Sequence, residues 1–177
     1  MNKKIITAVS IAVGVIGIGG FLFYKDAQVT KYSVNEDNKN ISQLGDTFEN
    51  LGSEHIKDGA EHKPYNSNPP TSGPHYFQPA EWGVYPNQLK DEQLVHNLEH
   101  GGIWISYKDI DPETKAKLET IGKANPGSVI VTPRPENDAK VVIASWTRLQ
   151  KLDSFDETKI LAFIKANKNK SPEPLAR

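Results

Sequence analysis

The sequence predicts an α+β fold in which a small mixed sheet is packed with helices. Three short segments rich in β-branched residues, at 102–107, 128–132 and 140–146, are typical of strands. Two further segments, one after the first of these strands and one after the third, place apolar residues at helical spacing. The order strand, helix, strand, strand, helix therefore predicts a βαββα core.

An irregular segment at 65–86 comes before this core. Its five prolines exclude a regular helix or a central strand, whereas its five aromatic rings favour burial. We therefore expect an ordered loop packed against the scaffold, and loops of this kind are often functional. The alternative is a proline-rich segment that binds a partner.

Two helices are predicted from their end signals. Residues 90–100 form a short helix candidate that Gly101 and Gly102 end, as glycine commonly does at helix C-termini. After the first strand, Asp111 is expected to cap a second helix with Pro112 in its first position.

The remaining elements follow the Asn-Pro-Gly turn at 125–127, which ends the second helix. The two later strands are joined by a turn at 133–138, so we expect them to pair as an antiparallel hairpin. A last helix is expected to begin at Asp153 or Ser154, because apolar residues then recur at helical spacing.

The N-terminus carries a candidate membrane anchor. Residues 5–24 hold no charge and follow the basic start MNKK, and about 20 apolar residues span the hydrocarbon core of a bilayer as a helix. Lys3 and Lys4 place the N-terminus in the cytoplasm by the positive-inside rule. The sequence thus predicts a single-pass protein of the cell membrane with an extracytoplasmic C-terminal domain. The alternatives are a cleaved signal peptide and a buried core helix.

The rest of the chain divides by composition. Residues 1–24 are the cytoplasmic tip and transmembrane anchor, 25–50 a flexible tether, 51–170 the soluble domain, and 171–177 a frayed tail. The net charge of −1 does not suggest a nucleic-acid partner. A protein or cell-envelope partner is left open.

The chain has no cysteine, which excludes disulfides, thiol chemistry and thiolate metal ligands. Its one methionine is Met1, so the soluble part has no thioether ligand. Any metal site must therefore use imidazole, carboxylate or backbone oxygen.

The histidines form the strongest functional signal. All five lie between residues 55 and 100: His55, His62, His75, His96 and His100. His96 and His100 are four residues apart on the predicted helix, so their rings can converge on one ion. His75 in the proline-rich loop completes a core of three ligands, and His55 is the expected fourth. His62 lies in a polar segment and is left out.

Glu99 lies between the two helical histidines. The sequence HNLEH matches the H-x-x-E-H pattern of inverted zinc proteases, in which the glutamate is the general base. Gly101 and Gly102 argue against such a protease, because its helix would continue beyond this point. Glu99 is then a metal ligand, a partner that orients an imidazole, or a solvated carboxylate at the helix end.

The leading hypothesis is a membrane-anchored, extracytoplasmic metal-binding protein. Its sulfur-free ligands suit a divalent transition metal, zinc or Cu(II), with iron as a further candidate. One alternative is a metal-dependent hydrolase, in which an open coordination position activates water. The other is a metal-free interaction module that uses the proline and aromatic loop. The sequence leaves open whether the protein is an enzyme.

Several motifs together resemble an uncharacterised prokaryotic family that is catalogued as a domain of unknown function, often with an N-terminal membrane segment. They are YNSNPPTSGPHY, WGVY, LVHNLEHGG, ASW and FDETKILAFIKANKNKSPEP, and they extend from about Gly52 to Pro174. The resemblance implies no particular activity. The family pattern includes residues that match His55, His75, His96, His100 and Glu99, whereas His62 falls outside it.

Overall fold

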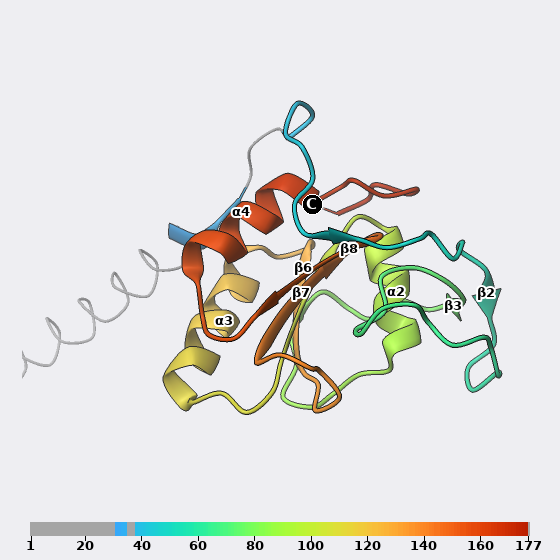
Figure 1. Ribbon diagram of the computed structural model, residues 1–177, viewed down its shortest axis with the longest axis horizontal. Helices are drawn as coiled ribbons and strands as arrows, with labels where there is room; N and C mark the ends of the chain where they lie inside the picture. The colour runs from blue at the N-terminus through green and yellow to red at the C-terminus, as the bar shows by residue number, and fades with distance from the viewer. Residues whose placement is uncertain (1–30, 35–37, 177) are drawn as a thin grey trace, which may run out of the picture.

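The computed structural model describes residues 31–34 and 38–176 of the 177-residue chain, and the expected transmembrane segment 5–24 lies outside them. Among the described residues, no helix has the length and apolar character needed to cross a bilayer. The described part of the chain is an α+β fold built around a mixed sheet, with helices on both faces (Figure 1).

Within the described residues, the main sheet has six strands in the order β1-β8-β7-β5-β6-β4. The strands are β1 (Asp46–Thr47), β4 (Gly83–Val84), β5 (Ile103–Tyr107), β6 (Val129–Pro133), β7 (Val141–Ser145) and β8 (Arg148–Leu152). β5 pairs in parallel with β6 and antiparallel with β7. The predicted α+β class and mixed sheet are confirmed, and the sheet is larger than the βαββα core implies.

The predicted hairpin between β6 and β7 is wrong, because β5 lies between these two strands. Ile105 of β5 is opposite Val131 of β6 on one side and Ile143 of β7 on the other. The segment from 134 to 140 therefore crosses from one side of β5 to the other. The apolar β-branched residues of β6 and β7 can pack equally well beside a central strand between them or beside each other. The residues that favour a strand therefore do not show which strand it pairs with.

The hairpin partner of β7 is β8, a strand that the sequence analysis did not identify. Ser145 is opposite Arg148, and the two residues between them form the turn. Thr147 there has a φ of 57°, a left-handed conformation that is uncommon for a β-branched residue. Two-residue hairpin turns usually carry asparagine or glycine, so the sequence lacked the usual signal.

Helices cover both faces of the sheet. α3 (Pro112–Ala124) and α4 (Glu157–Asn167) lie on one face, whereas α2 (Asp91–Glu99) lies on the other (Figure 1). Alternate residues of β5 serve the two faces: Ile103 and Ile105 pack with α3 and α4, and Trp104 packs with α2.

The helix ends agree with the sequence except at α4. Asp111 accepts a hydrogen bond from the backbone N–H of Thr114 and caps α3, with Pro112 in the first turn as predicted. α4 is capped by Asp156, whose side chain accepts from the N–H of Lys159. The predicted start at Asp153 or Ser154 is therefore two or three residues early, because β8 runs to Leu152 and the chain must turn before the helix begins.

Segments on both sides of the expected domain pack against it. Tyr32, in the segment expected to be a tether, is 5% exposed and donates from its hydroxyl to Glu157. β1, in the same segment, pairs with the edge strand β8. At the other end, Ala176 donates its backbone N–H to the carbonyl of His100. The folded unit thus extends upstream of residue 51 and includes most of the segment expected to be a frayed tail.

Candidate metal centre

A small second sheet brings the first two histidines together. β2 (His55–Ile56) and β3 (His75–Tyr76) pair in parallel, with His55 directly opposite His75. The backbone N–H of His75 donates to the carbonyl of Glu54, and that of Gly73 donates to Gly52. The proline-rich segment is therefore an ordered loop, as predicted, and it presents His75 from a backbone fixed on both sides.

Helix α2 supplies the other ligands from the adjacent layer. His96 and Glu99 lie three residues apart, so they share a face of the helix near its C-terminal end. Gly101 follows with a φ of +83°, the left-handed conformation that ends a helix cleanly. The side chain of Glu99 is 2% exposed, so the solvated carboxylate expected as one alternative is excluded.

Asn97 holds the loop on this helix. Its side chain accepts from the N–H of Ala80 at 2.9 Å and donates to the carbonyl of the same residue at 2.8 Å. The residue is buried, so neither backbone group would have water as a substitute partner if the amide were removed.

We expect Asn97→Ala to lower the free energy of unfolding by at least about 2 kcal/mol, because two buried backbone groups lose their partners. Urea unfolding followed by circular dichroism measures this. Asn66→Ala is the matched control, since the Asn66 amide donates to a backbone carbonyl at an exposed position. Equal effects of the two substitutions would contradict a clamping role for Asn97.

The centre itself is formed by His55, His75, His96 and Glu99, named here the His3Glu group. One ligand atom from each lies within 4.8 Å of every other. Ligands at ~2.0–2.1 Å from a tetrahedral zinc ion lie about 3.3 Å from one another, so modest side-chain movements bring the four onto one ion. This group could hold a metal ion.

The tautomers of two histidines are fixed by the backbone. Nδ1 of His75 donates to the carbonyl of Gly73 at 2.8 Å, and Nδ1 of His96 donates to the carbonyl of Tyr76 at 2.6 Å. A neutral imidazole has one N–H, so in each ring Nε2 keeps a free lone pair. A backbone carbonyl on the second ring nitrogen is the usual way in which metal-binding histidines are oriented.

The surroundings of Glu99 also favour a cation. Nε2 of His75 lies 3.0 Å from Oε2 of Glu99, so a lone pair faces a carboxylate oxygen. Among the described residues, the ion-pair partners of Glu99 are His55 and His75, and no lysine or arginine is among them. A buried carboxylate without a positive partner is costly. A metal ion placed between these atoms removes the conflict.

Burial lowers the pKa of both His75 and His96 below their usual value, and it outweighs the opposing effect of their hydrogen bonds to Gly73 and Tyr76. Both rings are therefore neutral at neutral pH, which is the form that binds metal.

The metal-free protein should lose stability as the pH falls from 7.5 to 5.5. The unfolded histidines titrate near 6.5, so below that pH the unfolded chain binds protons that the folded chain does not. The free energy of unfolding then decreases until the pH reaches the folded pKa values. Urea midpoints at several pH values measure the slope, and a double variant His75→Gln/His96→Gln should flatten it. An unchanged slope in that variant would refute the assignment.

One side of the His3Glu group opens to solvent. The side chain of His55 is 34% exposed, whereas His75 is fully buried and His96 nearly so. Phe77 stacks on the His55 ring with centroids 5.3 Å apart and is itself 59% exposed. An ion at this site would thus be reached from the side of His55 and Phe77.

His100 lies beside His96, as their spacing predicted, with 3.1 Å between the two Nε2 atoms. Its ligand atom groups with those of Glu99 and Glu173, and these three residues form a second ligand group beside the His3Glu group. Both groups therefore contain Glu99. His62 contacts Glu92 at 3.4 Å and packs on Tyr65, and it belongs to neither group.

Sequence reasoning missed Asn97 and Glu173. Asn97 could have been recognised from the sequence. It lies next to His96 in the predicted helix, and a polar amide buried there must have hydrogen-bond partners. Glu173 had none, because it lies in the proline-containing tail, far from the histidines in sequence. The backbone carbonyls of Gly73 and Tyr76 orient His75 and His96, and backbone groups cannot be recognised from a pattern of side chains.

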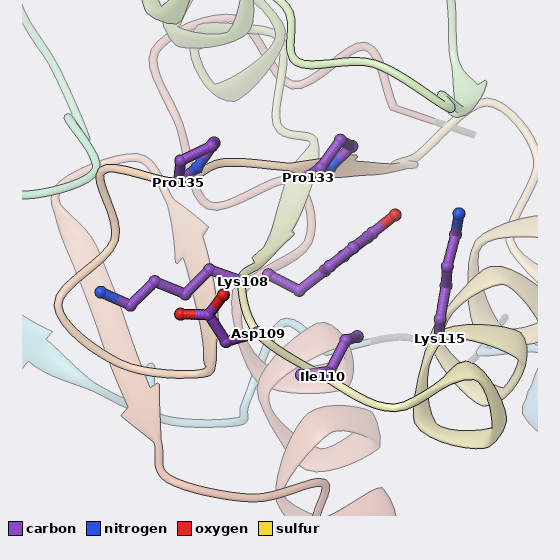
Figure 2. Close-up of a pocket in the computed structure, with 7 residues that line it drawn as sticks. Lys108, Asp109, Ile110, Lys115, Pro133 and Pro135 are labelled. Atoms are coloured by element: carbon purple, nitrogen blue, oxygen red, sulfur yellow. The ribbon is translucent and has the colours of Figure 1, made fainter.

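A separate pocket of about 290 Å³ lies where β5 and β6 end, and it is lined by Tyr107, Lys108, Asp109, Ile110, Lys115, Pro133 and Pro135. Figure 2 shows the two prolines on one side and Ile110 on the other. His100 precedes β5 and Lys108 follows it, so this strand separates the pocket from the metal ligands.

The comparisons with known proteins agree with the motifs. Searches of curated proteins and of solved structures found no match. A family model described as "Protein of unknown function (DUF3105)" matches residues 55–177, which is more than half of the chain and contains every residue of both ligand groups. The chain therefore belongs to the DUF3105 family of proteins of unknown function.

Proposed function

We propose that this protein binds a divalent transition-metal ion through the His3Glu group. The observation that carries the proposal is the contact between the Nε2 lone pair of His75 and the buried Glu99 carboxylate, with His96 and His55 beside them. The four ligand atoms converge, and backbone hydrogen bonds fix the tautomers of two of the imidazoles. Among the described residues, no lysine or arginine pairs with the Glu99 carboxylate. A metal ion would accept the lone pairs of the three imidazoles and compensate the charge of Glu99.

The donor set favours zinc or Cu(II), with iron as a further candidate. Three imidazoles and one carboxylate are borderline-to-hard ligands, and the chain has no thiolate that would select Cu(I). Zinc accepts a closed four-coordinate site without electronic preference for geometry. Cu(II) binds such donors more tightly than zinc at equal availability, so the supply of metal decides between them.

The test compares His96→Ala with His62→Ala in the full-length chain, purified in detergent and dialysed against zinc. We expect the wild type and His62→Ala to retain zinc, and His96→Ala to lose affinity by at least about 100-fold, more than the loss of an outer hydrogen-bond partner costs. Elemental analysis and calorimetric titration provide the two measurements. A wild-type chain that binds no metal under these conditions would refute the proposed function.

A metal-dependent hydrolase is the second proposal, and the exposure of His55 is the observation that favours it. If His55 only borders the site, then His75, His96 and Glu99 bind the ion and leave a solvent-facing position for a reactive water. His55→Ala separates the two proposals. Unchanged zinc affinity in this variant supports an open site, whereas a large loss supports a closed four-ligand site.

The metal-free interaction module is less well supported. Trp82 and Tyr85 are partly buried and pack against α2 and its neighbours, so most of the loop's aromatic surface is already used within the fold. Phe77 is the exception.

We further propose that residues 5–24 anchor the domain in the cell membrane, with the metal centre on the extracytoplasmic side. The support is the uncharged N-terminal run and the lysines before it. Protease treatment of intact cells tests this orientation. Digestion of the domain is expected, and full protection of it would contradict the proposal.

A further inference from the structure

The C-terminal segment packs against the end of α2, outside the His3Glu group. The backbone N–H of Glu173 donates to the carbonyl of Glu99, and those of Leu175 and Ala176 donate to the carbonyl of His100. Asn169 adds two side-chain hydrogen bonds to Ala176. The tail is thus fixed by its backbone against the residues that carry the ligands.

This arrangement places a second carboxylate at the centre. Oε2 of Glu173 lies 3.4 Å from Nε2 of His100. Ligand atoms of Glu99, His100 and Glu173 lie within 4.8 Å of one another. These donors come from the end of α2 and from the tail, so the tertiary structure, and not a local motif, assembles this second group.

Glu99 is common to both groups, and a carboxylate has two oxygens. In two-metal sites the ions lie about 3.5–4 Å apart, a separation that one bridging carboxylate spans. The His96 and His100 nitrogens lie 3.1 Å apart, a separation that suits two ligands of one ion as well as ligands of two neighbouring ions, so the distinction rests on the Glu173 carboxylate.

We propose that the centre holds two divalent metal ions, the second bound by His100 and Glu173 and joined to the first through the Glu99 carboxylate. This inference rests on the proposed function, because the first ion occupies the His3Glu group. The second site is the more exposed one, with side-chain exposures of 22% for His100 and 55% for Glu173. It therefore binds its ion more weakly and fills after the first.

The rival arrangement is a single ion that recruits His100 as a fifth ligand. That arrangement uses no donor from Glu173, so the carboxylate on the tail distinguishes the two. Two ions predict that Glu173→Gln removes one ion and keeps the other, whereas one ion predicts that this substitution changes nothing.

The experiment uses the full-length chain in detergent, titrated with Cu(II) and followed by calorimetry and by electron paramagnetic resonance. We expect the wild type to bind two ions in two steps and to show the half-field signal of two coupled Cu(II) ions. Glu173→Gln and His100→Ala should each bind one ion and give the spectrum of isolated Cu(II). Glu173→Gln leaves the backbone hydrogen bonds of the tail in place, so it reports on the carboxylate and not on folding.

The chain offers a matched control, because His62 and Glu92 form a second histidine–glutamate pair with the same 3.4 Å separation. His62→Ala and Glu92→Gln should both keep two coupled ions. A wild type that saturates with one ion, or a Glu173→Gln variant that retains both, overturns the two-ion centre and leaves the proposed function standing. A wild type that binds no ion overturns both.

Discussion

Saturation with zinc is expected to raise the midpoint of thermal unfolding by about 8–16 °C relative to the chelated protein. Zinc in ~1,000-fold excess over its dissociation constant stabilises the folded state by about 4 kcal/mol. For a domain of this size, each kcal/mol shifts the midpoint by about 2–4 °C. The ligands come from β2, β3 and α2, which are brought together only in the folded chain, so the ion binds the folded state selectively.

Scanning calorimetry with zinc and with excess chelator measures this shift. His96→Ala should remove the shift, and His62→Ala should preserve it, because His62 contacts Glu92 and not the His3Glu group. A wild-type midpoint that is the same with zinc and with chelator would show that no ion of this strength binds the folded domain.

Glu99→Gln is expected to have opposite effects on the metal-free and metal-bound protein. Without metal, the variant should be more stable than the wild type by about 1–3 kcal/mol, because an uncompensated buried carboxylate is removed. In the wild type, the Nε2 lone pair of His75 faces a carboxylate oxygen of Glu99, so two acceptors are in contact. A glutamine amide at this position can donate a hydrogen bond to Nε2. With zinc, the order should reverse, since the variant has lost its anionic ligand.

Urea unfolding with chelator and with zinc gives the four free energies of unfolding for this comparison. Glu92→Gln on the same helix is the control, and it should leave the zinc-induced gain unchanged. A metal-free Glu99→Gln protein that is less stable than the wild type would mean that the carboxylate stabilises the fold by itself. In that case, one of the two groups carries a proton and donates it in a hydrogen bond between His75 Nε2 and the Glu99 carboxylate.

The elements predicted correctly are those whose signals are local. The cap at Asp111 and the proline after it define the start of α3, and the glycines after Glu99 define the end of α2. Short apolar segments identify β5, β6 and β7 as strands. Each of these signals depends on residues within one or two turns or along a single strand, so the sequence contains it completely.

Strand neighbours were not predictable in the same way. β6 and β7 carry similar apolar residues, and either could pair with the other or with β5. The central place of β5 depends on α3, which carries the chain across the sheet so that β6 returns parallel to β5. β8 was missed because its polar residues do not read as a strand and the turn at Thr147 lacks glycine.

The ligand set shows the same division. The clustering of histidines identified His55, His75, His96 and His100, and the HNLEH pattern identified Glu99. The structure places all five at one end of α2 and the adjoining small sheet. The spacing did not predict that these residues divide into two ligand groups. His100 is the C-cap residue of α2, and its ion-pair contact is with Glu173 from the C-terminal tail.

The sequence by itself determined which residue types are available to bind metal, and it identified the three helices α2, α3 and α4 and the strands β5, β6 and β7. Only the tertiary structure decided that Glu99 is buried against His75, that His55 lies opposite His75, and that the tail brings Glu173 to His100. The physical reason is the distance along the chain over which each effect acts. Periodicity and capping depend on residues within a few positions. The partners of a buried charge such as Glu99 come from segments far apart in the chain, and only folding brings them together.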